Sequence, residues 1–191
     1  MAALEGPQYG PALGGKPDSL VLLLHGVGAD GFDLIDLAPV WAEALPRTLF
    51  IAPHAPFPFQ GAPYGRQWFD IMDRTPARME AGLRHAAGIL GDFTQAKLSE
   101  LGLGGDRLAL MGFSQGAMVA LFAGLRGAVP APACMAKRMK LSPPWPAARP
   151  PGLCKPKACR MNCCCGLIWS MGWMMPGWPP ALRFWRAALA K

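Results

Sequence analysis

The sequence predicts an α/β fold in which helices cover both faces of a mainly parallel β-sheet, giving three layers. Two nearly uninterrupted apolar runs of strand length, Ser19 to Leu24 and Leu108 to Met111, support this prediction, because strands covered on both faces are apolar throughout. Apolar residues with helical spacing lie between and after these runs, at 33–45, 75–101 and 115–126. The alternation of strand and helix patterns favours a parallel sheet.

The first part of the chain contains two of the predicted strands. Residues 1–18 are rich in glycine and proline, and we expect an edge hairpin or a loose arm there. The first apolar strand then runs into the sequence His-Gly-Val-Gly at 25–28. The helix predicted at 33–45 contains Pro39, which is expected to make it irregular or to split it. A second short strand is predicted at 48–52.

A long loop and a long helix come next. The segment 53–70 is rich in proline, glycine and aromatic residues, which argues against regular structure, and it is too long for a bare connection. Thr75 and Pro76 have the types expected for a helix cap and a first helical residue. Gly102 is expected to end this helix. Its predicted apolar face comprises Met79, Leu83, Ala86, Leu90, Phe93 and Leu98.

The stretch from 107 to 126 has the pattern of a nucleophile elbow. Gly112 and Gly116 flank Ser114 at two residues on either side, giving G-x-S-x-G between an apolar strand and an apolar helix. A serine on such a sharp turn has a strained backbone, and its neighbours must lack side chains so that strand and helix can approach closely. The helix N-terminus would direct free N–H groups at a developing oxyanion.

Composition bounds the class of protein. At 191 residues, with 52% hydrophobic and 16% charged residues, the chain is expected to bury one substantial core rather than to be disordered. No apolar run reaches the roughly 18 residues that a membrane-spanning helix requires, and the N-terminus lacks the pattern of a secretory signal. We therefore expect a cytoplasmic protein without a transmembrane segment.

Charge divides the chain into two parts. Residues 1–134 hold 9 Lys and Arg against 12 Asp and Glu, a net charge of −3. Residues 135–191 hold 10 Lys and Arg, no Asp or Glu, and five of the six cysteines, for a net charge of +10. The division predicts one domain over 1–134, with the elbow at 112–116, followed by a basic, poorly ordered tail over 135–191.

Four stretches of the first two-thirds of the chain carry a family resemblance. They are LLLHGVGADGFDLIDLA at 22–38, IAPHAPFP at 51–58, QWFD at 67–70 and LMGFSQGAMVAL at 110–121. In this order and spacing, residues 20–133 resemble the phospholipase/carboxylesterase family of α/β-hydrolases, which contains the acyl-protein thioesterases. The resemblance implies an α/β-hydrolase three-layer sandwich that hydrolyses a small-molecule ester or thioester without a cofactor.

The resemblance also implies roles for particular residues. Ser114 aligns with the family nucleophile, which attacks the carbonyl carbon. The oxyanion hole would use the backbone N–H groups of Val27 and Gln115, both at the carboxyl ends of neighbouring parallel strands, where α/β folds build their sites. Trp68 belongs to the W-F-D segment and is expected either to line the acyl pocket or to serve as a packing aromatic in the loop.

The partners that a serine nucleophile needs are missing from the remainder of the sequence. This fold supplies them in the order Ser, Asp or Glu, His, but no Asp, Glu or His follows Ser114. His25, His54 and His85 all lie upstream. The resemblance gives His25 a structural role in supporting the oxyanion loop, and none of the three is assigned as base. The chain is therefore expected to be inactive or impaired, or else to be a catalytically dead acyl-binding or interaction protein.

The tail has the features of a frameshifted translation that begins between about residues 130 and 160, which would leave the last strands of the fold missing or replaced. Met and Trp have one codon each, so the bases encoding 170–176 are largely fixed. Read in a frame shifted by one base, these bases are compatible with the H-G-x-x-D-x-x-V segment that carries the family's catalytic aspartate.

The tail's cysteines contain no paired C-x-x-C, so no metal site is expected. The basic cluster at 137–140 has no nucleic-acid-binding module around it, so no nucleic-acid partner is expected.

Overall fold

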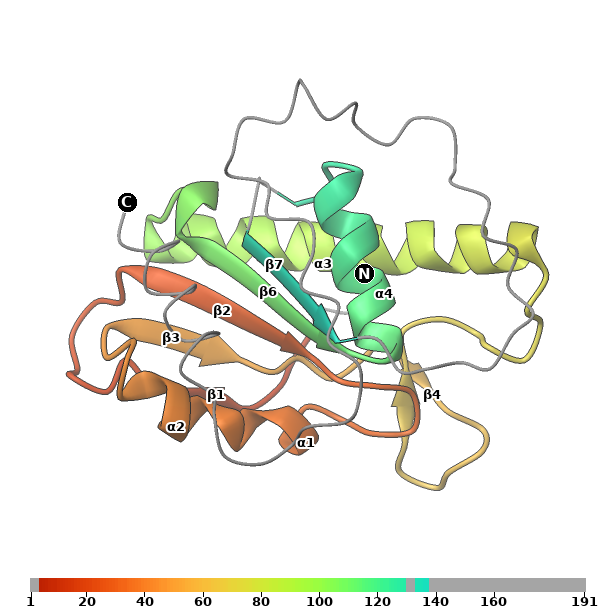
Figure 1. The fold of residues 1–191 in the computed structure, drawn as a ribbon, viewed down its shortest axis with the longest axis horizontal. Coiled ribbons are helices and arrows are strands. Elements are labelled where there is room, and N and C mark those ends of the chain that lie inside the picture. Colours follow the sequence, from red (N-terminus) through yellow and green to blue (C-terminus); the bar gives the residue numbers. More distant parts are fainter. Residues whose placement is uncertain (1–3, 130–132, 138–191) are drawn as a thin grey trace.

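A five-stranded sheet between two layers of helices forms the body of the protein (Figure 1). The computed structural model describes residues 4–129 and 133–137. Its elements in chain order are β1 (Gln8–Tyr9), β2 (Ser19–Leu24), α1 (Phe32–Ile35), α2 (Leu37–Ala42), β3 (Thr48–Ile51), β4 (Phe57–Pro58), β5 (Arg66–Gln67), α3 (Pro76–Leu101), a 3-10 turn (Gly105–Arg107), β6 (Leu108–Phe113), α4 (Gln115–Leu125) and β7 (Ala133–Lys137).

The strands are ordered β1-β3-β2-β6-β7 across the sheet. β3, β2, β6 and β7 are parallel to one another, and only the two-residue β1 is antiparallel, at the edge beside β3. The predicted mainly parallel α/β sheet is therefore confirmed. The central strands β2 and β6 pair from Leu20 with Leu108 to Leu24 with Gly112, so their carboxyl ends lie side by side.

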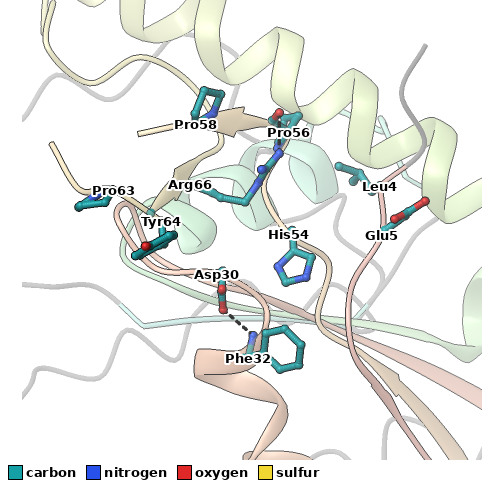
Figure 2. Close-up of a pocket in the computed structure, with 11 residues that line it drawn as sticks. Leu4, Glu5, Asp30, Phe32, His54, Pro56, Pro58, Pro63, Tyr64 and Arg66 are labelled. Atoms are coloured by element: carbon teal, nitrogen blue, oxygen red, sulfur yellow. Dashed lines mark hydrogen bonds between the residues drawn. The ribbon is translucent and has the colours of Figure 1, made fainter. Parts of the chain in front are cut away.

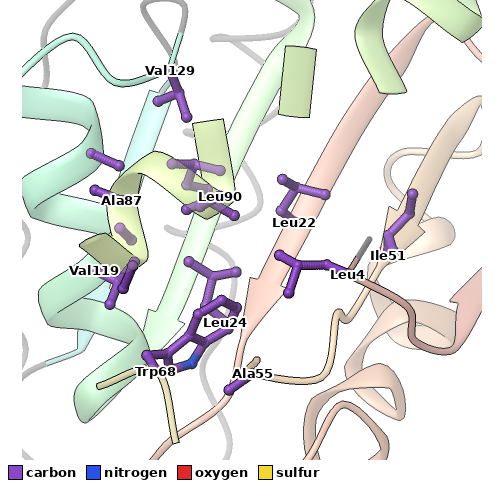
Figure 3. Close-up of a cluster of buried hydrophobic side chains, with 14 of the residues drawn as sticks. Leu4, Leu22, Leu24, Ile51, Ala55, Trp68, Ala87, Leu90, Val119 and Val129 are labelled. Atoms are coloured by element: carbon purple, nitrogen blue, oxygen red, sulfur yellow. The ribbon is translucent and has the colours of Figure 1, made fainter. Parts of the chain in front are cut away.

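Alternate residues of the central strands point to opposite faces, as the period of a β-strand requires. Leu20, Leu22 and Leu24 of β2 pack in the core beneath α3 and α4, together with Leu90 of α3 (Figure 3). Val21 and Leu23 point the other way and pack with Trp41 and the rest of the α1–α2 layer. Because β2 is fully buried on both faces, its continuous apolar sequence is explained.

The helix boundaries follow local sequence signals. α3 begins at Pro76 after an extended Thr75 and ends at Gly102, whose backbone is left-handed with φ 66°, as predicted. The predicted helix at 33–45 is divided into α1 and α2, with the break at Asp36 rather than at Pro39. Pro39 lies in the first turn of α2, where its missing N–H has no intrahelical acceptor to lose.

Two expectations from the sequence are corrected. If the last strands of the fold were missing, the outer edge of the strand at 108–113 would lack a partner. This expectation is wrong, since β7 pairs along β6 in parallel from Ala133 to Lys137. β7 thus crosses the predicted boundary at 134. The loop 53–70 was expected to lack regular structure, but it contains the short antiparallel pair β4–β5. Both pairings use backbone groups, which the side-chain pattern does not reveal.

The predictions for residues 138–191, including the cysteine cluster and the frameshifted tail, lie outside the described residues. Within the described part of the chain, no helix is both long and apolar enough to cross a membrane.

Replacing Leu90 with alanine is expected to lower the free energy of unfolding by about 2–5 kcal/mol, because it leaves a cavity in a packed core. The Leu90 side chain has 0% exposure and lies between α3 and the sheet. Urea unfolding measures the change. The matched control is Leu13→Ala: Leu13 is 68% exposed, so its loss is expected to stay within about 0.5 kcal/mol. Equal losses in the two variants would contradict this account of the core.

Candidate active site

Ser114 lies on a sharp turn between β6 and α4. Its φ of 50° and ψ of −115° are a combination that a residue with a side chain rarely adopts, and it is the one described non-glycine residue with positive φ. The Ser114 side chain makes no capping bond to the helix. The predicted strained turn is therefore present, with the hydroxyl free of the helix it precedes.

The flanking glycines permit this turn. A Cβ on Gly112 would collide with the backbone of Gly116 and Ala117, where α4 begins over the end of β6. A Cβ on Gly116 would collide with the carbonyls of Leu24 and His25, at the end of β2. The first turn of α4 therefore lies directly against the backbone of two strands. As predicted, the elbow glycines are required by close approach.

The two predicted oxyanion donors have no competing acceptor among the described residues. Gln115 is the first residue of α4, so its N–H has no intrahelical acceptor. Val27 makes no backbone hydrogen bond to another described residue. Gly26, next to Val27, lies against Ser114, because a Cβ on Gly26 would be 3.3 Å from the Ser114 Cβ. The structure thus brings Ser114, Val27 and Gln115 into one neighbourhood.

The Gln115 side chain is buried and makes hydrogen bonds through both its oxygen and its nitrogen. Its Oε1 accepts the N–H of Trp68 at 2.8 Å, and its Nε2 donates to the carbonyl of Phe69 at 2.8 Å. The indole N–H of Trp68 in turn donates to the His25 carbonyl at 2.9 Å. Trp68 itself has 0% exposure and lies in the core. Its position favours the packing role, and its role in an acyl pocket stays a prediction.

His25 is a buried neutral imidazole. Its Nε2 accepts the N–H of Ala55 at 2.9 Å, which leaves the ring proton on Nδ1, 2.7 Å from the carbonyl of Gly26. Burial is the main cause that lowers the pKa of His25, outweighing the hydrogen bond to Gly26 that raises it. Both ring nitrogens are occupied, so His25 has no lone pair to offer Ser114.

The other two histidines lie on different elements. His54 follows β3; its Nδ1 accepts the N–H of Gly31 at 3.0 Å, and its ring faces Phe32 with the centroids 5.5 Å apart. His85 is an exposed residue of α3 whose ring faces Phe57. No hydrogen bond joins either ring to Ser114 within the described part of the chain.

Arg66, the first residue of β5, joins this strand to the loop after β2. Its carbonyl accepts the N–H of Gly28 at 2.8 Å, and its own N–H donates to Ala29 at 3.0 Å. Its guanidinium donates through Nε to the carbonyl of Ala55, and through Nη2 to that of Pro56 at 3.0 Å. Two of these four hydrogen bonds hold the residues directly after Val27, and the other two hold the segment after β3.

A cavity of about 590 Å³ lies beside this segment (Figure 2). Charged groups and aromatic rings line it, among them Glu5, Asp30, Phe32 and Tyr64, with His54 between them. Neither Ser114 nor Trp68 contributes to its lining. Within residues 4–129 and 133–137, no group of three or more His, Cys, Asp or Glu side chains could hold a metal ion.

The side-chain roles of Gln115 and Arg66 were not predicted from the sequence. The elbow pattern pointed only to the backbone N–H of Gln115. Arg66 offered a weak signal: it is the only Lys or Arg in the proline-rich loop 53–70. Prolines supply carbonyl acceptors but no N–H donors, so such a loop needs donors from side chains.

The free energy of unfolding is expected to fall as the pH drops below about 6.5, the ordinary pKa of histidine. The unfolded chain gains a proton there while folded His25 stays neutral, because its pKa is lowered. The contribution of His25 is therefore complete above that pH and is lost as the pH falls toward the folded pKa, with a slope of at most about 1.4 kcal/mol per unit.

Urea unfolding from about pH 8 to about pH 5 measures this slope. His25→Gln keeps an acceptor for Ala55 but cannot titrate, so the slope should become shallower. His85→Gln, at an exposed position, should leave the slope unchanged. An unaltered slope in His25→Gln would contradict the assignment.

Comparison with known proteins now identifies the family. The Phospholipase/Carboxylesterase family model matches residues 12–144, which include every element from β2 to β7. Acyl-protein thioesterase 1 of Schizosaccharomyces pombe is 34% identical over 110 residues, covering 55% of this chain and 48% of that protein. Esterase YpfH of Escherichia coli strain K12 is 31% identical over 107 residues, covering 56% and 46%. The chain spans about half the length of the curated relatives it matches.

Solved structures agree with this match. The crystal structure of esterase PE8 is 41% identical, with a TM-score of 0.63 over 72% of this chain and 64% of that one. The Bacillus cereus carboxylesterase, at 19% identity and a TM-score of 0.56, covers 72% of this chain and 60% of its own and shares the fold. The elbow, the parallel sheet and a family match over more than half its length show that this chain belongs to the phospholipase/carboxylesterase family of α/β-hydrolases.

Proposed function

We propose that this chain carries the nucleophile and the oxyanion hole of a serine hydrolase for carboxylic esters or thioesters. Ser114 Oγ attacks the carbonyl carbon of the substrate, and the N–H groups of Val27 and Gln115 stabilise the tetrahedral oxyanion. The alcohol or thiol then leaves with a proton, and water hydrolyses the acyl-enzyme to release a carboxylic acid.

The observation that supports this proposal most directly is the backbone of Ser114. A φ of 50° at a non-glycine residue is costly, and strain of this kind persists where the surroundings hold it in place. The turn lies directly before the first residue of α4, with the Ser114 Cβ close to Gly26. A buried structural serine would gain nothing from such a geometry, whereas a nucleophile requires it.

We further propose that the chain as written turns over slowly. A serine hydroxyl is a weak nucleophile without an adjacent base, and no Asp, Glu or His follows Ser114 within these 191 residues. His25 is engaged through both ring nitrogens. This absence favours a second candidate, an acyl-binding or interaction protein that keeps the site without turnover.

Three further predictions from the sequence are kept as parts of this proposal. The hydrolase domain predicted over 1–134 extends to the end of β7 at Lys137, and the rest of the predicted tail to 191 has a different origin. Trp68 supports the acyl side of the site. The substrate is a small-molecule ester or thioester, with no nucleic-acid partner and a cytoplasmic location.

The coding DNA is expected to reveal the origin of the tail. Shifted by one base, the frame that encodes residues beyond about 134 should contain a His-Gly-x-x-Asp-x-x-Val segment opposite 170–177, followed by a Gly-His segment that supplies the base. Sequencing the transcript checks this. If no Gly-His segment follows in that frame, the tail is not a displaced family C-terminus.

Imidazole added as an external base is expected to raise hydrolysis of p-nitrophenyl butyrate in a manner that depends on Ser114. A general base contributes about 10²–10⁴-fold, so the Ser114-dependent rate should rise at least about tenfold above the imidazole background. Ser114→Ala should abolish that increment and the labelling by a fluorophosphonate probe. Ser99→Ala, an exposed serine of α3, is the matched control and should keep both.

Equal rates for Ser114→Ala and the unaltered chain at every imidazole concentration would refute the hydrolase proposal. Binding of butyrate without any Ser114-dependent labelling or hydrolysis would favour the acyl-binding protein instead.

A further inference from the structure

The loop that carries Val27 is held from both sides. On the C-terminal side of Val27, the Gly28 N–H donates to the Arg66 carbonyl at 2.8 Å, and the Arg66 N–H donates to the Ala29 carbonyl at 3.0 Å. On the N-terminal side of Val27, the His25 ring accepts the N–H of Ala55 at 2.9 Å. The peptide unit that bears the Val27 N–H also carries the Gly26 carbonyl, which accepts the His25 Nδ1–H at 2.7 Å and the Ala29 N–H at 3.3 Å. It therefore cannot rotate without breaking these bonds.

Arg66 joins these two sides. Its backbone bonds the segment after Val27, and its guanidinium bonds the carbonyls of Ala55 and Pro56. Ala55 is the residue whose N–H holds the His25 ring. The two bonds of the guanidinium come from two nitrogens to consecutive carbonyls, a fixed fork that a lysine ammonium cannot reproduce.

The Gln115 side chain completes the connection to the elbow. Its amide bonds the backbone of Trp68 and Phe69 at 2.8 Å on each side, and the Trp68 indole bonds the His25 carbonyl at 2.9 Å. Gln115, whose backbone N–H is one of the two proposed oxyanion donors, is thus held in place by its own side chain. Through the Trp68 indole, these bonds connect Gln115 to His25 and so to the loop of Val27, the second proposed donor.

We propose that the side chains of Arg66 and Gln115 are positioning residues that set the distance between the two oxyanion N–H groups. Together with His25, Ala55 and Trp68 they form a hydrogen-bonded circuit, called here the oxyanion circuit. The inference rests on the proposed function. Oxyanion stabilisation depends on donors that are fixed before the charge develops, so a circuit that fixes both donors acts on the tetrahedral state and not on the planar ground state.

This difference gives a test that does not need turnover. Butaneboronic acid forms a tetrahedral adduct when the Ser114 Oγ adds to boron, and it places a boron-bound oxygen where the oxyanion would lie. Butyramide has the same chain but remains planar. Dissociation constants for both ligands are measured by NMR titration on the full chain, with thermal unfolding to verify that each variant is folded.

Arg66→Met and Gln115→Met are expected to raise the dissociation constant of butaneboronic acid about tenfold or more, since loss of one oxyanion donor alone costs about 10²–10³-fold in rate. Butyramide binding should change less than about twofold. Arg66→Lys should recover only part of the loss, because it restores the charge without the fork. Arg84→Met and Gln95→Met, at exposed positions of α3, are matched controls and should change neither ligand.

Amide hydrogen exchange supplies a second measurement in the free protein. Arg66→Met should accelerate exchange at Gly28, because the Arg66 backbone carbonyl that accepts the Gly28 N–H is no longer fixed by the guanidinium bonds. The core amides of β2 should keep their protection. If Gln115→Met does not fold, Gln115→Glu replaces it: this variant keeps the shape and the acceptor for Trp68 but loses the donor to Phe69.

The outcomes separate the two proposals. If the unaltered chain forms no adduct that Ser114→Ala abolishes, the proposed function fails and the positioning roles fail with it. If the adduct forms but the Arg66 and Gln115 variants bind it normally, or weaken both ligands equally, only the positioning proposal is overturned. Selective weakening of the tetrahedral ligand, with faster exchange at Gly28, supports it.

Discussion

The contact on which the rest of this structure depends is the approach of the first turn of α4 to the end of β2. Gly116 lies so close to the carbonyls of Leu24 and His25 that no side chain fits between them. This approach forces the chain to turn within one residue, at Ser114, and it brings the loop after β2 against the elbow. The strain at Ser114 is a consequence of that packing, held by the sheet and helices around it.

Packing of the helix layers against the sheet stabilises this contact. β2 is buried on both faces, with one set of leucines beneath α3 and α4 and the other against the α1–α2 layer. β6 is paired on both edges, with β2 and with β7. Ser114, between the end of β6 and the start of α4, cannot relax without disrupting this packed interior, which costs more than strain of about 1–3 kcal/mol at one residue.

Much of this architecture could be predicted from the sequence, because it depends on side-chain patterns. Continuous apolar runs identified β2 and β6, a cap and a glycine bounded α3, and G-x-S-x-G located the elbow. The pairing of β7 and the short β4–β5 pair could not be predicted, since both depend on backbone hydrogen bonds. The side-chain bonds of Gln115 and Arg66 could not be predicted either, because they join carbonyls and N–H groups that become neighbours only after the chain has folded. For His25 the resemblance implied a structural role, but not which groups its ring would bond.

The oxyanion circuit has a consequence for the order in which the protein folds. Its bonds join residues far apart in sequence: Ala55 to His25 across 30 residues, Trp68 to His25 across 43 and Trp68 to Gln115 across 47. Closing such long loops costs entropy before any bond repays it. We therefore expect the circuit to close only after β2, β3 and β6 have come together.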